Sequence, residues 1–479
     1  MRTGENAGGF GSPPHSTSPR HVREARLHQS LSRAREAELN LAVLYKSKHE
    51  HAVGFGQPGR EFWPEALNRA SVGLLCVVLA FGPLAFGAVQ PWAICTLQLG
   101  ATACLIVWAL RQLTDGALKI HWNPLFVPAL LFGALIGIQL ALGRSSYWFA
   151  TWQGALLWAA YGMLFFVATQ CFRSTSSLTA FALFFTGYGF LVAFFAIVQQ
   201  FTWNGNLYWV VHLRDGGWGY GPYVNHAHYA GLMEMLTPIP LVLAMTERWE
   251  KPQRTLFGFI ALVMAGTIFL SKSAGGILAF SVQMAFFGIM LAVRQRSRTQ
   301  MLLLLSFGVL LVIWLTTFSP GGIGEGIAKL GDAGKSGRVL MTKDSLKLIA
   351  QRPLLGWGLG TFPVVYPSVR SFHTNFLVNA AHNDCIQIAV ETGLVGLLLA
   401  LGFAVLLYRN GLRETAAWRT SVGGSVRMAA LIGATGILVH SFWDFNLQIP
   451  ANAALFFVLA AIATADRNGR QTSRTSPLS

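Results

Sequence analysis

The chain has 479 residues, of which 53% are hydrophobic and only 12% are charged, whereas a soluble domain usually carries about 25% charged residues. This composition excludes a nucleic-acid-binding module, a disordered protein and a disulfide-stapled secreted domain, and it indicates a protein whose solvent is mostly lipid. The net charge of +16 fits that class, because cytoplasmic loops of membrane proteins carry an excess of Lys and Arg.

Residues 1–68 differ in composition from the rest of the chain. They are polar and basic, and no apolar stretch near Met1 resembles the core of a cleaved signal peptide. We predict a mobile cytoplasmic tail, although residues 24–46 have a pattern that would also allow a short helix. Residues 466–479 are predicted to form a second cytoplasmic tail.

Residues 69–465 are a series of apolar stretches of bilayer length. The expected fold class is therefore all-α, a polytopic transmembrane bundle of about twelve spans. The expected spans are 69–88, 92–110, 124–142, 148–170, 178–200, 226–246, 255–271, 274–293, 301–317, 385–407, 428–441 and 451–465.

The distribution of Lys and Arg predicts the orientation of these spans. With the N-terminus inside, the inside segments hold 26 of the 36 Lys and Arg residues, and the short outside segments hold three. Such an excess marks the cytoplasmic side. We expect both termini in the cytoplasm, and the basic balance needs no nucleic acid to explain it.

Two outside segments are unusually long, 201–225 and 318–383. Long loops in compact proteins are usually functional or disordered. The second loop contains a plausible helix from Arg338 to Gln351 that places apolar residues opposite lysines, which is typical of a helix at the membrane surface.

Polar residues at the start of the 226–246 span form a first candidate cluster, comprising Asn225, His226, His228 and Glu234. Polar groups within a membrane are expensive and often functional. The alternative is an Asn225 helix cap with a carboxylate satisfied by its neighbours. The two histidines are two positions apart and do not share a helix face, which argues against a zinc pair.

Lys272 lies in a second cluster, the short hairpin Ser271–Gly276 between two spans. A lysine here is held close to the membrane surface. It either contacts an anionic substrate or only extends its amine toward water.

The long loop supplies a third cluster, with Arg338, Arg352 and the stretch Gly356-Trp-Gly-Leu-Gly360. This stretch follows no strand and opens no dinucleotide-binding unit, so a tight backbone turn is the better interpretation. The loop ends in His382-Asn383-Asp384, and Gln387 and Glu391 follow.

A fourth cluster, with His440, Asp444 and Asn446, lies between the last two spans. Asp444 is close enough in sequence to orient the His440 imidazole, but the hairpin could also satisfy its own polar groups.

Together these loops place several cations and histidines on one membrane face. Such a set suits an anionic substrate with a transferable group, because Arg binds a departing diphosphate and His can accept a proton from a hydroxyl. No cluster of carboxylates resembles a Mg²⁺ site. We therefore expect neither a metal nor another cofactor.

The stretches SGRVLMTKDSLKLIAQRPLLGWGLGTF and AHNDCIQIAVETGLVG resemble the signature of the O-antigen ligase/polymerase superfamily. YGPYVNHAHYAGLMEM, SKSAGG and VHSFWDFNLQIPAN extend the similarity over most of residues 200–455. The resemblance implies a metal-independent, inverting glycosyltransferase of the bacterial inner membrane, with its active site facing the periplasm. Its donor would be a glycan on undecaprenyl diphosphate. Its acceptor would be a lipid A core, a growing polysaccharide or another hydroxyl.

The resemblance also implies roles for individual residues. Arg338 would bind the donor diphosphate and His382 would be the base for the acceptor hydroxyl. Lys272 stands where the family usually has Arg, which keeps the charge and loses the two-pronged hydrogen bonding of a guanidinium. Arg352 is a further candidate for the diphosphate. The supporting positions are Asn225, His226, Glu234, Asn383, Asp384, Glu391, His440 and Asp444.

Two alternatives remain open. A flippase or transporter of a lipid-linked oligosaccharide would also suit twelve spans, but it would carry ionisable residues near the bilayer midplane, where Glu234 is the main candidate. A protein O-oligosaccharyltransferase would share the transfer chemistry and differ in its acceptor.

Overall fold

The computed structural model describes residues 62–213, 219–295, 298–318, 337–373, 378–415, 418–465 and 476–477. Most of the expected N-terminal tail, most of the expected C-terminal tail and part of the long loop lie outside these residues. The fold described below belongs to the unit Trp63–Ser479.

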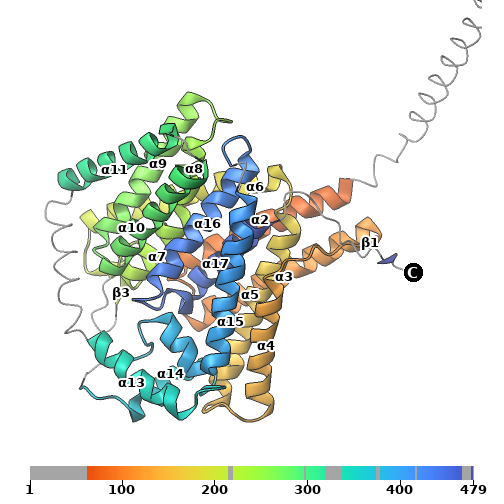
Figure 1. The fold of residues 1–479 in the computed structure, drawn as a ribbon, viewed down its shortest axis with the longest axis vertical. Coiled ribbons are helices and arrows are strands. Elements are labelled where there is room, and N and C mark those ends of the chain that lie inside the picture. The colour runs from red at the N-terminus through yellow and green to blue at the C-terminus, as the bar shows by residue number, and fades with distance from the viewer. Residues whose placement is uncertain are drawn as a thin grey trace, which may run out of the picture. The chain divides into compact units, whose positions relative to one another are not determined.

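Every apolar stretch expected to span the membrane is helical (Figure 1). The helices are α2 (Phe62–Leu84), α3 (Pro91–Asp115), α4 (Phe126–Ala141), α5 (Trp148–Cys171), α6 (Thr175–Phe201), α7 (His226–Leu236), α8 (Pro238–Met245), α9 (Lys251–Leu270), α10 (Ala274–Ile289), α11 (Arg298–Phe318), α15 (Asp384–Glu414), α16 (Val422–His440) and α17 (Pro450–Thr464). A π-helical turn, Met290–Gln295, extends α10.

Within the described residues, eight helices are long and apolar enough to cross a membrane: α2, α3, α5, α6, α9, α10, α15 and α16. The helices α4 and α17 are apolar but shorter, with 16 and 15 residues. The class of polytopic helical membrane protein is therefore confirmed. The count of twelve spans stays a prediction.

The segment 226–246, which the sequence predicts as one span, consists of two helices. Helix α7 ends at Leu236 and α8 begins at Pro238. Proline has no backbone N–H to continue the hydrogen bonding of the preceding helix, but it fits the first position of a new one. Pro238 therefore explains the division.

Helices α16 and α17 form the centre of the bundle. Figure 1 shows them between α7, α9, α10 and α11 on one side and α3, α4 and α5 on the other. Almost every side chain of α17 is buried. A Cβ at Gly433 of α16 would lie 2.6 Å from the Met235 carbonyl oxygen, so glycine allows α16 to approach α7 this closely.

The described part of the long loop, 337–373 and 378–383, folds into a small cap at one end of the bundle (Figure 1). It contains α13 (Gly337–Gln351), α14 (Phe362–Val365) and a 3₁₀ turn (Tyr366–Ser368). The predicted helix Arg338–Gln351 is thus confirmed. Met341, Leu348, Phe362, Tyr366 and Val390 give the cap an apolar core of its own.

The described strands are two residues long and pair antiparallel. They are β1 (Ala117–Leu118) with β4 (Ser476–Pro477), and β2 (Asn206–Leu207) with β3 (Val211–His212).

Helix α15 is interrupted at Gly393, where the cap enters the bundle. Gly393 has φ 69°, and a Cβ there would lie 2.1 Å from the Leu354 carbonyl oxygen. The opened turn lets the carbonyl oxygens of Val390 and Glu391 accept hydrogen bonds from Trp357 N–H and Gly358 N–H, at 3.0 and 2.9 Å. The cap is therefore joined to the bundle through this glycine.

We expect Gly393→Ala to lower the free energy of unfolding by about 2–4 kcal/mol. The reasons are the cost of a left-handed backbone for a residue with a Cβ and the overpacking against Leu354. Gly402→Ala, in the same helix with open space around its Cβ, should be neutral or stabilising. Thermal unfolding in detergent measures both changes. Equal melting temperatures for the two variants would contradict the structural role assigned to Gly393.

Candidate active site

The buried carboxylate of Asp444 lies at the centre of the polar cluster on the cap side of the bundle. One oxygen accepts hydrogen bonds from His382 Nδ1 at 3.2 Å and from Phe445 N–H at 2.9 Å. The other lies 3.6 Å from Arg338 Nη2, and Arg338 Nη1 donates to the Trp443 carbonyl oxygen at 2.8 Å. The Asp444 carboxylate therefore links Arg338, at the start of α13, to His382, just before α15.

The contact with Asp444 fixes the tautomer of the neutral His382 ring. An ionised carboxylate only accepts hydrogen bonds, so Nδ1 carries the hydrogen of the neutral ring and Nε2 keeps its lone pair. The ring packs edge-on against Phe445 with centroids 4.8 Å apart, and the side chain is 25% exposed. This imidazole is held by neighbours on one side and is accessible on the other.

Opposing effects set the charge of Asp444. Burial raises the pKa of its carboxyl, but the hydrogen bond from His382 and the charges of His228, His382 and Arg338 together hold this pKa well below its usual range. Asp444 therefore remains ionised at neutral pH and attracts the positive charge that His382 acquires when it takes up a proton.

Asn383 and Asp384 attach the end of the cap to the connector between α16 and α17. Asn383 caps α15 by accepting from Ile386 N–H at 3.0 Å, and its amide donates to the Phe442 carbonyl oxygen at 3.0 Å. Asp384 accepts from Leu447 N–H at 3.1 Å and from Gln448 Nε2 at 3.3 Å. These contacts explain how His382 is positioned over Asp444.

The hairpin that carries Lys272 packs against residues 440–444, the segment that also contains Asp444. The ring of His226 hydrogen-bonds the Ser271 carbonyl oxygen at 2.8 Å. A Cβ at Gly275 would lie 2.9 Å from His440 Nε2 and 3.7 Å from the Trp443 Cβ. The residues 440–444 thus contact the Lys272 hairpin and bind Arg338.

Lys272 and His382 also share an unusual backbone conformation. Their φ angles are 56° and 49°, in the left-handed region that residues with a Cβ seldom adopt. Such conformations persist where the surrounding structure enforces them, and they are frequent at functional sites.

His440 pairs with Glu234, and Asp444 pairs with His382. The two side chains of the first pair are fully buried, with His440 Nδ1 2.9 Å from a Glu234 oxygen. Asn225 caps α7 by accepting from Ala227 N–H at 2.8 Å, which confirms the helix-cap interpretation. The contact between Glu234 and His440 therefore connects α7 to α16.

Arg352 lies apart from Arg338. The two residues stand near opposite ends of α13, 14 positions apart, which corresponds to about 21 Å along a helix. The Arg352 guanidinium stacks on Trp357 at 4.2 Å and donates to the Arg144 carbonyl oxygen at 3.2 Å. In this arrangement the two guanidinium groups make separate contacts, Arg338 with Asp444 and Arg352 with Trp357. A role for Arg352 at the diphosphate stays a prediction.

Glu391 organises the glycine-rich turn of the cap. It accepts from Gly360 N–H at 2.9 Å and from Phe362 N–H at 3.2 Å. Gly356, Gly358 and Gly360 all have positive φ, which confirms the tight backbone turn predicted for this stretch.

Two glutamines with structural roles were not among the sequence candidates. Gln139 of α4 donates to the carbonyl oxygens of Leu355 and Glu391, at 2.6 and 2.8 Å. Gln283 of α10 donates to the carbonyl oxygens of Glu234 and Ile432, at 2.8 Å each. In both cases the sequence feature that could have identified the residue was a polar amide within an apolar span.

No group of three or more His, Cys, Asp or Glu that could hold a metal occurs in the part of the chain that the structure describes.

The fold and this cluster define a polytopic helical membrane protein with cations and an aspartate–histidine pair at one end of the bundle. Residues 259–401 match the family model described as O-antigen ligase. The matched segment contains Lys272, Arg338 and His382. This match, over less than a third of the chain, confirms the resemblance to the O-antigen ligase/polymerase superfamily found in the sequence. No curated protein matches the chain.

Proposed function

We propose that the protein is an inner-membrane glycosyltransferase that transfers or polymerises glycan from an undecaprenyl-diphosphate donor on the periplasmic face. Its pathway would be the synthesis of a surface polysaccharide, either O-antigen or exopolysaccharide. The observation that carries this proposal is the contact of one carboxylate, Asp444, with both His382 and Arg338.

The proposed step uses His382 as the general base. The acceptor hydroxyl oxygen attacks the anomeric carbon, and its proton passes to His382 Nε2. The bond between the anomeric carbon and the diphosphate oxygen breaks on the opposite face, so the configuration inverts. Asp444 stabilises the imidazolium that forms, in the way that a buried aspartate supports a catalytic histidine elsewhere.

Positive side chains would balance the negative charge on the departing diphosphate. Arg338 is 48% exposed beside Asp444, so its guanidinium is accessible to an anion. Lys272 lies in the hairpin that packs on the same turn. In the proposed reaction these two residues supply the charge stabilisation that a metal ion supplies in many diphosphate-dependent transferases, and the reaction is metal-independent.

The periplasmic placement of the site rests on the charge distribution of the loops. The cap and the Lys272 hairpin both belong to outside segments when the Lys-rich and Arg-rich loops are cytoplasmic.

Reconstituted liposomes test the transferase against the flippase. The purified protein is supplied with an undecaprenyl-diphosphate glycan and with candidate acceptors on the site side, and products are followed by mass spectrometry. The proposal predicts a new glycosidic product and free undecaprenyl diphosphate. Movement of intact donor across the bilayer without any such product would favour the flippase, for which the buried Glu234–His440 pair is the relevant feature.

We expect Lys272→Ala to reduce transfer by about 10²-fold and Lys272→Arg to retain most of it, because a guanidinium preserves the charge at the diphosphate. Turnover at saturating donor measures both. Lys251, at the start of α9, provides the matched control, and Lys251→Ala should leave transfer unchanged. Equal activities for Lys272→Ala and wild type would exclude a role for Lys272 in charge stabilisation.

A further inference from the structure

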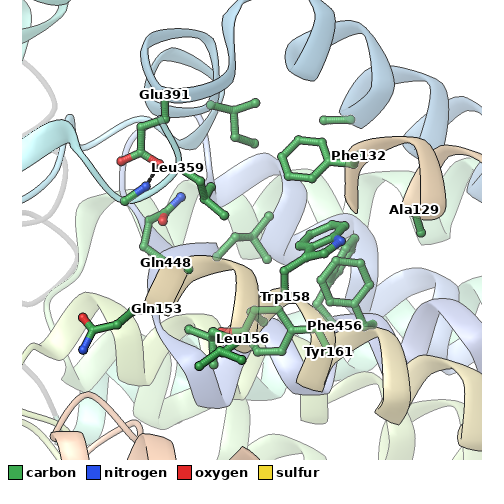
Figure 2. A pocket seen from close by; sticks show the side chains of 18 of the residues that line it. Ala129, Phe132, Gln153, Leu156, Trp158, Tyr161, Leu359, Glu391, Gln448 and Phe456 are labelled. Carbon is green, nitrogen blue, oxygen red and sulfur yellow. Dashed lines mark hydrogen bonds between the residues drawn. The ribbon is translucent and has the colours of Figure 1, made fainter. Parts of the chain in front are cut away.

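A second candidate site lies beside α15, the helix that begins two residues after His382. It is an elongated cavity of about 560 Å³ between α3, α4, α5, α15 and α17. Figure 2 shows Phe132, Trp158, Tyr161 and Phe456 gathered at one end and Glu391 with Gln448 at the other. The volume is within the range of sites that bind small organic ligands.

The dimensions and lining of the cavity suit a hydrocarbon chain. Its lining on α5 runs from Ala150 to Tyr161, about 17 Å along a helix. That length is close to one leaflet, half of the ~30 Å hydrocarbon core. Cys95 and Leu156 line the cavity and are also exposed, so it opens sideways onto the surface of the bundle.

Exposed aromatic residues mark the level of the cavity mouth. Trp148, Phe149 and Trp152 lie in the first turns of α5, around the lining residue Ala150, and all three are exposed. The two indoles stack with centroids 5.7 Å apart. Trp and Tyr are enriched at the membrane–water interface, so this end of the cavity lies at the level of lipid headgroups.

Two exposed arginines stand at that level. Arg144 belongs to the hairpin between α4 and α5, and Arg352 donates a hydrogen bond to its carbonyl oxygen. Ser146 N–H bonds to the Trp357 carbonyl oxygen at 2.8 Å, two residues before Leu359, which lines the cavity. Neither 142–147 nor 352–360 contains an acidic residue. The rim is therefore cationic, which favours an anionic headgroup.

We propose that the cavity holds one hydrocarbon chain of a phosphate-bearing lipid, with Arg144 and Arg352 against its headgroup. This site is separate from the diphosphate position at Arg338, about 21 Å away along α13. Its polar end is joined to the histidine segment, because Gln448 lines the cavity and donates to Asp384.

Photo-crosslinking tests the lipid site without any turnover. The full chain in nanodiscs receives phosphatidic acid with a diazirine at the end of one chain, and labelled residues are mapped by mass spectrometry. A diacylglycerol with the same chain lacks the phosphate and serves as the comparison probe. We expect labels from phosphatidic acid at cavity residues such as Phe132, Phe403 and Phe456, and labelling by diacylglycerol that is at least tenfold weaker there.

The variants separate the headgroup from the chain. Arg144→Ala combined with Arg352→Ala should reduce cavity labelling roughly tenfold or more, whereas Arg370→Ala, an exposed arginine elsewhere in the cap, should not change it. Ala404→Trp should abolish labelling by filling the cavity. Millimolar inorganic phosphate should not compete, because the chain supplies most of the binding.

Any of four results would contradict the proposed lipid site. The two probes could label equally, or the labels could spread over outward residues such as Leu99 and Leu130. Labelling could also be unchanged in the double arginine variant, or free phosphate could compete with it. Confirmed labelling in a protein that forms no glycosidic product would leave the lipid site standing and remove the transferase function.

Discussion

Asp444→Asn is expected to lower turnover of glycan transfer by about 10²- to 10⁴-fold, the range over which a positioned general base contributes. The amide cannot stabilise a protonated His382, and its NH₂ group, if turned toward Nδ1, would favour the tautomer without a free Nε2 lone pair. The measurement is turnover at saturating donor and acceptor. His382→Ala should cost as much, and the double variant little more, because the two residues act as one unit.

Glu247→Gln is the control for this substitution. Glu247 is an exposed carboxylate paired with Arg419, and its loss should leave turnover unchanged. Full activity of Asp444→Asn, or a double variant whose loss is the product of the two single losses, would contradict the coupling of Asp444 to His382.

The pH dependence of stability provides an independent check on Asp444. Its folded pKa lies below the unfolded value of about 3.9. The carboxylate therefore contributes stability above that unfolded value, and the contribution is lost as the pH falls toward the folded pKa. The melting-temperature difference between wild type and Asp444→Asn should be constant above about pH 5 and shrink below pH 4.

Arg338→Ala is expected to reduce turnover by about 10²- to 10³-fold, the loss that follows removal of one group aimed at developing negative charge. Arg338→Lys should recover only part of this, because an ammonium keeps the charge without the planar pair of donors. Turnover and the donor KM are measured together. We expect the larger effect on turnover, since the charge on the diphosphate grows as the bond breaks.

Arg370→Ala provides the matched control for Arg338→Ala. Both arginines are exposed in the cap, but Arg370 lies outside the described cluster. Equal turnover for these two variants, or a loss at Arg338 seen only in the donor KM, would contradict transition-state stabilisation by Arg338.

The helices were the most predictable part of the fold, because a stretch of apolar residues long enough to cross lipid has little alternative to a helix. The helix at Arg338 was also predictable, but not the face that it buries: Met341 and Leu348 are buried, whereas Val339 and Leu346 remain exposed. The division at Pro238 could have been foreseen from the proline itself, but hydropathy averaged over a span conceals it.

The pairing of side chains was less predictable. His382 and Asp444 are 62 positions apart, and no local pattern indicates that Asp444 faces His382 rather than His440, its neighbour in sequence. Arg352 appeared to belong with Arg338 because both lie in one loop. In the folded structure the two residues stand near opposite ends of α13, and their shared position in one loop does not reveal this separation.

Release of undecaprenyl diphosphate in the presence of EDTA tests the central claim most directly. Purified protein in nanodiscs receives a lipid-linked glycan donor and an acceptor, and wild type is compared with Arg338→Ala and His382→Ala. We expect release by wild type that chelation leaves unchanged and that both substitutions abolish. Undiminished release by either variant, or loss of wild-type release on chelation, would contradict glycosyl transfer by this arginine and histidine.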